Sequence, residues 1–337
     1  MTAPFRIFDP LLPSAEADAM LALCERFGSY RTYAEDVTAS EPYAPQIPQR
    51  YDAAANFVRS GGRFGRREAP EVLASRTNYF RATYAYEKPE TPGIEPFLYH
   101  EGFVEAARAI HGRPLVVPNI VYANLLLPGQ ELAVHTDVPE FRGANRKRYP
   151  QWLIVVMLHS GLFDRWRMPI ATAVAYFGTC RGGEFAFYPD GPDGAPRELA
   201  VKHNTAVIID TDTVFHGVDR VLETIPLPAV RPGAELRFAP DTGAWHLTSD
   251  RGEPLGTYRF GDLRFSVSWK AYCYADEAER ERVERHADDL ELGFILDTLE
   301  RDLRARGALA GPRPAEHDFG RLLIDRYIHF PASRAPR

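Results

Sequence analysis

A histidine and an aspartate lie two residues apart in the segment 127–137, which reads LPGQELAVHTD. In an extended chain, residues i and i+2 point to the same face, so His135 and Asp137 can reach one metal ion. A second isolated histidine, His216, follows another apolar stretch. Two imidazoles and one carboxylate bind one face of a divalent metal and leave positions open for other ligands. These three residues therefore predict a metal site.

Other histidines and aspartates in the chain compete for the role of metal ligand. The competing histidines between residues 119 and 270 are His159, His203 and His246. His216 is preferred because the predicted core strand 206–209 leads to it. Asp210, Asp212 and Asp219 have the surroundings of turn and capping residues. The histidines outside this region are predicted to be structural: His100, His111, His286, His317 and His329.

The composition is that of a soluble globular protein, with 45% hydrophobic, 12% aromatic and 26% charged residues. The formal net charge of −6 argues against a general nucleic-acid or anionic-membrane binder. No apolar run approaches the roughly 18 residues that cross a bilayer. The first residues, MTAPFR, lack the apolar core of a secretory signal. The three cysteines form no CxxC pair, so we expect neither a disulfide framework nor a zinc ribbon, and a cytoplasmic location.

Alternating and apolar stretches predict strands through the middle of the chain, punctuated by glycine and proline turns. The predicted strands are residues 78–86, 115–127, 131–135, 171–177, 183–188, 206–209 and 263–269. Short β-prone pieces at 235–238, 245–248 and 257–260 predict an inserted hairpin or two. The apolar run 151–158 fits either a buried strand or a helix that begins after Pro150, because periodicity does not separate the two in so short a run.

Helical spacing marks both flanks. Ser14 has the position of an N-cap before an amphipathic helix that ends near Phe27, and residues 96–111 predict a second helix. Charged helical sequence begins at Asp276 and carries apolar residues at a spacing of three to four up to residue 303.

Two arginine-rich segments are predicted to be solvated. Residues 59–67, RSGGRFGRR, have no phosphate-loop pattern and predict a loop, with a lid over a site as the alternative. The basic segment 142–148 follows the metal pair directly, and attraction of a negatively charged substrate or carrier is its alternative role.

Many short strands between helical flanks predict a mainly β fold of the α+β type, a sandwich or barrel with helices outside it. We predict one catalytic domain over residues 1–337. Residues 1–118 form its N-terminal flank of helices and strands, and 119–270 form its core, with insertions at 138–169 and 221–262. Residues 271–337 form a C-terminal helical extension.

Five motifs in one order resemble the Fe(II)- and 2-oxoglutarate-dependent dioxygenases, prolyl hydroxylases among them. The resemblance covers about residues 119–269. The motifs are the lead-in Asn124-Leu-Leu-Leu-Pro-Gly, the pair His135-Thr-Asp137, the glycine pair Gly182-Gly183, the distal His216, and Arg264-Phe-Ser266. The family fold is a double-stranded β-helix, also called a jelly roll, similar to cupins. Any one motif is weak, but five in this order are specific.

The resemblance implies a role for each motif. The three metal-binding residues would hold Fe(II). Arg264 would bind the far carboxylate of the cosubstrate 2-oxoglutarate, with Ser266 on the same strand face. Asn124 would form a hydrogen bond with 2-oxoglutarate. O2 would be the second cosubstrate. Hydroxylation of a C–H bond would release succinate and CO2.

The chain departs from the family pattern at two positions. The tyrosine of the lead-in is Leu126 here, and Arg264 lies 48 residues after the distal histidine, beyond the usual short gap. Arg220 and Arg259 are therefore alternatives for the carboxylate-binding arginine. Asp137 is present, whereas halogenating relatives lack this carboxylate, so oxygenation is favoured over halogenation.

We expect a small-molecule or amino-acid-like substrate, because the insertions have the length to enclose a pocket. The candidate lining residues are Trp152, Arg165, Trp166 and Arg167. A peptidyl or protein hydroxylase is the alternative within the enzyme class, and a non-catalytic jelly-roll binding protein is the alternative outside it. We expect no nucleic-acid or membrane partner, and nothing in the sequence indicates an oligomeric state.

Overall fold

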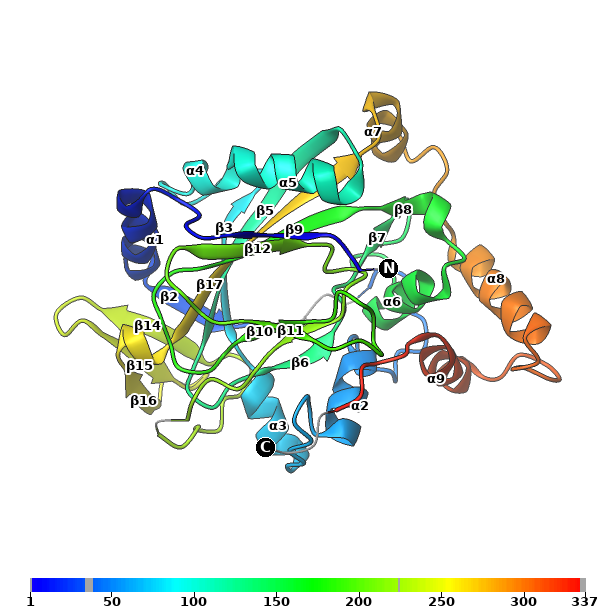
Figure 1. Ribbon diagram of the computed structural model, residues 1–337. Helices are drawn as coiled ribbons and strands as arrows, with labels where there is room; N and C mark the ends of the chain where they lie inside the picture. Colours follow the sequence, from blue (N-terminus) through cyan, green and yellow to red (C-terminus); the bar gives the residue numbers. More distant parts are fainter. Residues whose placement is uncertain (1, 34–38, 224, 334–337) are drawn as a thin grey trace.

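Two antiparallel sheets face each other in the computed structural model, which describes residues 2–33, 39–223 and 225–333 (Figure 1). The strands of the larger sheet are β1 (Phe5–Phe8), β2 (Ser29–Thr32), β3 (Phe80–Tyr86), β4 (Lys88–Pro89), β5 (Leu115–Leu126), β9 (Ile170–Tyr176), β12 (Thr205–Ile209), β14 (Glu235–Ala239), β15 (Ala244–Thr248), β16 (Pro254–Tyr258) and β17 (Arg264–Tyr274). Those of the smaller sheet are β6 (Leu132–His135), β10 (Phe185–Phe187), β11 (Arg197–Leu199) and β13 (His216–Val218). A separate two-stranded ribbon pairs β7 (Glu140–Phe141) with β8 (Arg167–Met168).

The strand order defines the fold as a jelly roll. Four neighbouring strands of the larger sheet run in the order β12-β9-β17-β5, and the smaller sheet runs β11-β10-β13-β6. The chain passes between the sheets repeatedly, from β5 to β6, from β9 to β10, from β12 to β13 and back to β17. Eight strands in two facing sheets with these crossings form a double-stranded β-helix. The predicted fold class is therefore confirmed.

Some helices lie across the outer faces of the two sheets, and others lie beside the barrel (Figure 1). They are α1 (Ser14–Phe27), α2 (Tyr51–Ser60), α3 (Pro70–Thr77), α4 (Glu95–Leu98), α5 (Glu101–His111), α6 (Gln151–Ser160), α7 (Glu277–Glu284), α8 (Leu292–Ala305) and α9 (Glu316–Tyr327), with single 3-10 turns at Asp164–Trp166 and Phe260–Asp262. Figure 1 shows α4 and α5 lying across one face of the larger sheet. Phe103 of α5 packs against the buried Trp269 of β17. The indole N–H of Trp269 donates to the carbonyl of Leu98, in α4, at 2.7 Å. This layer fixes β17, the strand that carries Arg264.

A second apolar core lies beside the barrel, where α6, α8 and α9 pack together. Its fully buried members include Trp152, Ile295, Leu299 and Leu323. Of the two structures that the sequence allowed, the run 151–158 forms a helix. Its apolar residues are buried on all sides, as is typical of a helix inside a bundle. In the part of the chain that the structure describes, no helix has the length and apolarity to span a membrane.

Several predicted element boundaries are wrong. Pro13 takes the N-cap position of α1, so Ser14 is already the first helical residue. The helix predicted over 96–111 divides into α4 and α5, because His100 caps the second one and accepts a hydrogen bond from the Phe103 N–H. The segment 59–67 begins inside α2, and its Arg63 is buried and paired with Asp219. Residues 61–67 nevertheless form a loop, and Arg66 and Arg67 in it are exposed as predicted.

The insertion 221–262 extends the larger sheet. Its strands β14, β15 and β16 continue that sheet beyond β2, and Trp245 and Leu247 pack into the outer core with Tyr30. No hydrogen bond or ion pair of its described residues reaches the predicted metal ligands. The expectation that this insertion encloses the site is therefore not supported by its position.

Candidate metal centre

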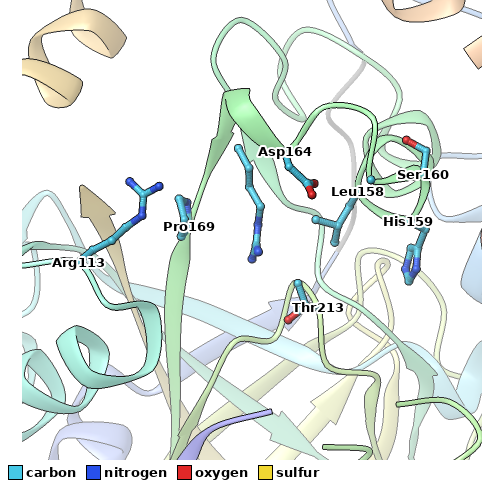
Figure 2. Close-up of a pocket in the computed structure, with 9 residues that line it drawn as sticks. Arg113, Leu158, His159, Ser160, Asp164, Pro169 and Thr213 are labelled. Atoms are coloured by element: carbon cyan, nitrogen blue, oxygen red, sulfur yellow. The ribbon is translucent and has the colours of Figure 1, made fainter. Parts of the chain in front are cut away.

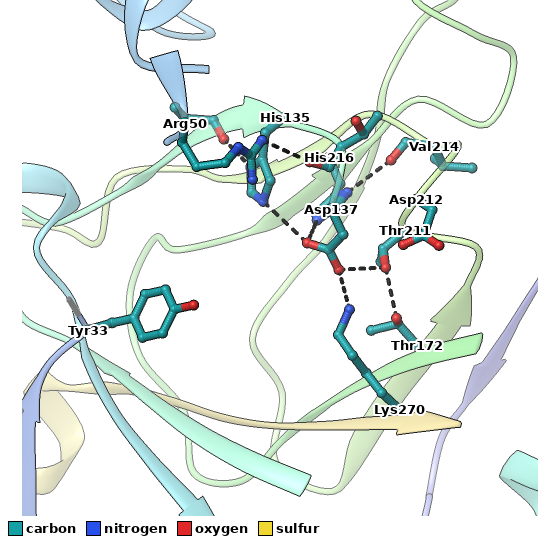
Figure 3. Close-up of polar contacts among 12 residues, drawn as sticks. Tyr33, Arg50, His135, Asp137, Thr172, Thr211, Asp212, Val214, His216 and Lys270 are labelled. Carbon is teal, nitrogen blue, oxygen red and sulfur yellow. Dashed lines mark hydrogen bonds and ion pairs between the residues drawn. The ribbon is translucent and has the colours of Figure 1, made fainter. Parts of the chain in front are cut away.

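The smaller sheet brings the three predicted metal ligands together. His135 ends β6 and lies opposite His216, the first residue of β13, while Asp137 follows two residues after His135. One ligand atom from each residue can be chosen so that all lie within 4.8 Å of one another. The Oδ1 atom of Asp137 is 3.6 Å from the Nε2 atoms of both histidines (Figure 3). Two imidazole nitrogens and a carboxylate oxygen thus converge as a facial metal site requires.

Backbone carbonyls fix the orientation of both imidazoles. The Nδ1 of His135 lies 2.7 Å from the carbonyl of Ala133, and the Nδ1 of His216 lies 2.9 Å from that of Val214. A proton on each Nδ1 satisfies these contacts and leaves each Nε2 with a lone pair towards Asp137. Burial, and next the neighbouring His216, lower the pKa of His135, which favours the neutral ligand form.

The second oxygen of Asp137 is held by two donors. Its Oδ2 accepts from the hydroxyl of Thr211 at 2.7 Å and from the ammonium of Lys270 at 2.6 Å (Figure 3). Burial raises the pKa of Asp137, but Lys270 and the two histidines outweigh it and hold the pKa well below its usual range. The carboxylate is therefore charged, and its Oδ1 faces the histidines.

A buried arginine lies at the start of β17, where the sequence predicts residues that bind 2-oxoglutarate. We call the group around this arginine the cosubstrate cradle. Arg264 is only 2% exposed, and it donates to the carbonyl of Gly183 at 2.7 Å and to the hydroxyl of Ser266 at 3.1 Å. Its Nη2 is buried without a hydrogen-bond partner among the described residues, and so is the hydroxyl of Tyr176. Tyr176 lies opposite Ser266 in the sheet, with its ring 5.1 Å from the guanidinium carbon.

These two unpartnered donors fit the far carboxylate of 2-oxoglutarate. A buried donor without an acceptor costs about 1–3 kcal/mol, so such a pair is retained where a ligand completes it. A carboxylate accepts from a guanidinium and a phenol at once. Leu126, where the lead-in of the family has a tyrosine, carries no hydroxyl, and Tyr176 is a phenol beside Arg264. We did not identify Tyr176 from the sequence, although its place just before a glycine-rich turn was visible.

The glycine pair leaves the space that Arg264 occupies. Gly183 has a φ of +73°, and a Cβ on it would lie 2.8 Å from the Cδ of Arg264. A Cβ on Gly182 would lie 2.6 Å from the carbonyl oxygen of Arg220. The pair is thus needed both for its backbone conformation and for the close approach of the arginine.

The remaining cradle candidates have other surroundings. Arg220 donates to Glu131 at 2.9 Å and to Glu68 at 2.8 Å, so its charge is already matched. Arg259 is exposed. Asn124 lies opposite Ser266, and its side-chain oxygen accepts from Arg81 at 2.9 Å. Of the three arginines weighed from the sequence, Arg264 alone has a buried donor left over among the described residues.

The competing residues have structural contacts. His159 lies 3.2 Å from the hydroxyl of Thr136 and stacks on Phe215, and burial lowers its pKa to about 4. Asp219 pairs with the buried Arg63, and Asp210 accepts two hydrogen bonds from Arg167. These carboxylates serve ion pairs as well as turns.

A cleft of about 570 Å³ is lined in part by Thr213, a residue of the loop that precedes His216 (Figure 2). Its lining includes Arg113, His159, Arg167 and Thr213. Of the four pocket residues predicted from the sequence, only Arg167 lines this cleft. Trp152 and Trp166 are buried in the helical core, and the guanidinium of Arg165 lies 3.7 Å over the ring of Trp166.

Comparison with known proteins finds no matching family model and no matching curated protein. Solved structures do match. A prolyl-4-hydroxylase of Pseudomonas putida is 12% identical, with 81% of this chain and 94% of that chain covered and a TM-score of 0.39. The prolyl hydroxylase of Trichoplax adhaerens is 12% identical, with 83% and 87% covered and a TM-score of 0.41. HygX of Streptomyces hygroscopicus, with nickel and 2-oxoglutarate bound, is 10% identical, with 81% and 83% covered and a TM-score of 0.40.

These similar structures are of the class that the sequence motifs indicate. Another match, from Burkholderia pseudomallei, is described as an oxidoreductase of the 2OG-Fe(II) oxygenase family. The identities and TM-scores are low, so the fold assignment depends on the strand order of this chain, and the roles of its residues depend on their own geometry.

Proposed function

We propose that this protein is an Fe(II)- and 2-oxoglutarate-dependent dioxygenase that hydroxylates a C–H bond of a small molecule. The observation that carries the proposal is the pairing of two sites inside one barrel. Three convergent metal ligands lie at the end of β6 and the start of β13, and two unpartnered buried donors lie on the adjoining strands β9 and β17. A metal-free binding protein would need neither arrangement.

In this proposal His135, Asp137 and His216 hold Fe(II), which when bound supplies the activation of O2. Arg264 and Tyr176 grip the far carboxylate of 2-oxoglutarate, and Ser266 orients the guanidinium. Lys270 and Thr211 hold the Oδ2 of Asp137 so that Oδ1 remains towards the metal. One oxygen atom of O2 enters the substrate and the other enters succinate, with loss of CO2.

Succinate release under air tests the proposal. The wild type with Fe(II) and 2-oxoglutarate should form succinate slowly even without substrate, and His135→Ala should abolish it. Arg264→Met should raise the half-saturating 2-oxoglutarate concentration at least about tenfold, because a charged hydrogen bond contributes roughly 1.5–3 kcal/mol. Arg259→Met, at an exposed arginine, is the matched control and should leave this concentration unchanged.

The alternatives predict different results. Absence of succinate with the metal-loaded wild type would favour a non-catalytic binding protein. Stimulation of 2-oxoglutarate turnover by prolyl peptides, and by no small molecule, would favour a peptidyl hydroxylase.

A further inference from the structure

Lys270 and Arg81 are cations on the interior face of the larger sheet, as Arg264 is. Lys270 lies six residues further along β17 and thus on the same strand face. Its ammonium donates to Asp137 at 2.6 Å, and no other hydrogen bond of it to a described residue is present. An ammonium carries three N–H donors, so Lys270 has donors left for a ligand. Its side chain is 16% exposed, which gives solvent access.

Arg81 is the second cation, and aromatic rings fix its plane. Its guanidinium carbon lies 3.9 Å from the ring centre of Tyr33 and 4.0 Å from that of Tyr122. The Nε donates to Asn124 at 2.9 Å, and the Nη2 donates to the hydroxyl of Tyr79 at 2.8 Å. Within the described ranges, Nη1 has no acceptor and the guanidinium has no carboxylate partner. A stacked arginine with one free end is preorganised for an anion.

The register places Arg81 apart from the cosubstrate cradle. Arg81 lies opposite Asn124, Asn124 opposite Ser266, and Ser266 opposite Tyr176, in one row across the strands β3, β5, β17 and β9. Neighbouring strands are about 4.8 Å apart, so the backbone of Arg81 is roughly 10 Å from that of Ser266 in this row. Arg81 therefore adds a separate position on the same face of the sheet. Tyr122 and Asp137 each interact electrostatically with both Arg81 and Lys270, so the two cations border the same part of the barrel.

The charges in the interior do not balance once the proposed ligands are bound. The far carboxylate of 2-oxoglutarate would match Arg264, and the metal would be matched by Asp137 and the keto-acid end. Among the described residues, the acid that then acts on Lys270 is Asp212, and burial together with Asp210 raises the pKa of Asp212 to about 7. Arg81 has no carboxylate partner in the described ranges, so the cations of this group exceed its anions. Buried charge is costly unless it is paired, which favours an anionic ligand.

We propose that Arg81 and Lys270 form a second anion-binding subsite, and that it holds the carboxylate of a small carboxylic-acid substrate beside the metal. This inference rests on the proposed function. A planar guanidinium end and one ammonium suit a carboxylate, whereas a phosphate group is usually held by more donors. Tyr33 and Tyr122 keep Arg81 in place and add apolar surface for the rest of the substrate.

The basic segment 142–148 adjoins this subsite in part. Arg146 lies 3.3 Å from the hydroxyl of Tyr33, and the ammonium of Lys147 lies 5.8 Å from the ring centre of Tyr86. Arg142 and Arg148 instead bind Asp288 and Glu41 and tie the segment to its surroundings. Lys147 adds positive potential beside Tyr86, which attracts acids.

Ligand binding to the protein loaded with Ni(II) and 2-oxoglutarate tests the subsite without turnover. The probes are two pairs of an acid and its amide: benzoate with benzamide, and N-acetyl-L-leucine with its primary amide. Calorimetric titration measures the binding of each. We expect each acid to bind at least about tenfold more tightly than its amide, because a charged hydrogen bond contributes roughly 1.5–3 kcal/mol. Arg81→Met and Lys270→Met should each remove this preference, whereas Arg259→Met should keep it.

The outcomes separate the two proposals. Failure of the wild type to bind Ni(II) with 2-oxoglutarate would refute the proposed function. Normal 2-oxoglutarate binding without any preference for acids would refute the subsite alone. An Arg81→Met variant that loses affinity for 2-oxoglutarate, and keeps its affinity for the acids, would also refute the subsite. Displacement of benzoate by sulfate or phosphate at a lower concentration than by acetate would refute it as well. Circular dichroism melting of each variant verifies that it is folded.

Discussion

The side chains of Thr211 and Lys270 fix the orientation of the Asp137 carboxylate towards a metal. One of its oxygens faces the two histidines, and the other is held by Thr211 and Lys270. Such outer contacts orient a ligand and tune its basicity, and their loss typically costs 10–100-fold in metal affinity. The two holding residues lie far apart in the sequence, on the loop before β13 and on β17, so the site depends on contacts from both sheets.

Thr211→Val should therefore weaken Fe(II) binding by about one order of magnitude, because Asp137 Oδ2 loses its hydroxyl donor. Competition with a metal-sensitive dye under anaerobic conditions measures this affinity. Thr213→Val is the matched control, since Thr213 lines the cleft of Figure 2 and its hydroxyl donates, among the described residues, to the carbonyl of Asp210 at 3.5 Å. Equal affinities of the two variants would contradict the role of Thr211.

Asp212 makes the stability of the metal-free protein depend on pH. It is fully buried, its carboxylate oxygens accept no hydrogen bond from a described residue, and burial with Asp210 raises its pKa to about 7. The unfolded chain releases this proton near about pH 4, so the folded state binds more protons between about pH 4 and 7. The stability contributed by this proton is present at acidic pH and is lost as the pH rises through that window.

Asp212→Asn should flatten this part of the stability profile and raise the free energy of unfolding at pH 8 by a few kcal/mol, at about 1.4 kcal/mol per pKa unit. Urea unfolding of the chelator-treated protein at pH 5 and pH 8 measures the difference. Asp241→Asn, at an exposed aspartate, should change neither value. A variant with the slope of the wild type would show that Asp212 titrates normally.

At the scale of elements, the register of β9 and β17 places Tyr176 beside the residues of the cosubstrate cradle on β17. The turn with Gly182 and Gly183 leaves the space that Arg264 occupies. The glycine pair precedes β10, and β17 delivers Arg264 beneath it. The sequence motif showed the glycines and the arginine but not their contact, because the turn and β17 are separated by about eighty residues in the chain. Tyr176, Arg81 and Lys270 escaped prediction for the same reason, since cross-strand partners depend on a register that no local pattern specifies.

Gly183→Ala should raise the 2-oxoglutarate requirement and lower stability together. The new Cβ would meet Arg264 at 2.8 Å, and the positive φ adds roughly 1–3 kcal/mol of strain. Gly161→Ala is a strict control, because Gly161 has a similar φ of +68° and a Cβ added there would meet no neighbouring atom within 4 Å. Both variants should lose stability, but only Gly183→Ala should change the half-saturating 2-oxoglutarate concentration in the succinate assay.

At the scale of the whole molecule, the sequence predicted the jelly roll and the order of its motifs, and it predicted little of what surrounds them. The alternation of strands is local and readable, so β5, β6, β9, β12 and β17 were found. The helical core around Trp152 and the sheet extension by β14 to β16 arise from long-range packing of apolar surfaces, which periodicity does not assign to a partner. The division into one domain with three parts stays a prediction.

An anaerobic titration with Fe(II) and 2-oxoglutarate tests the central claim most directly. The account predicts a weak visible charge-transfer band that needs both components and saturates at one metal per chain. The band should be absent in His135→Ala, and in Arg264→Met it should require at least about tenfold more 2-oxoglutarate. A folded wild type that binds Fe(II) but never develops the band would contradict the claim that the three ligands and the Arg264 cradle form one site.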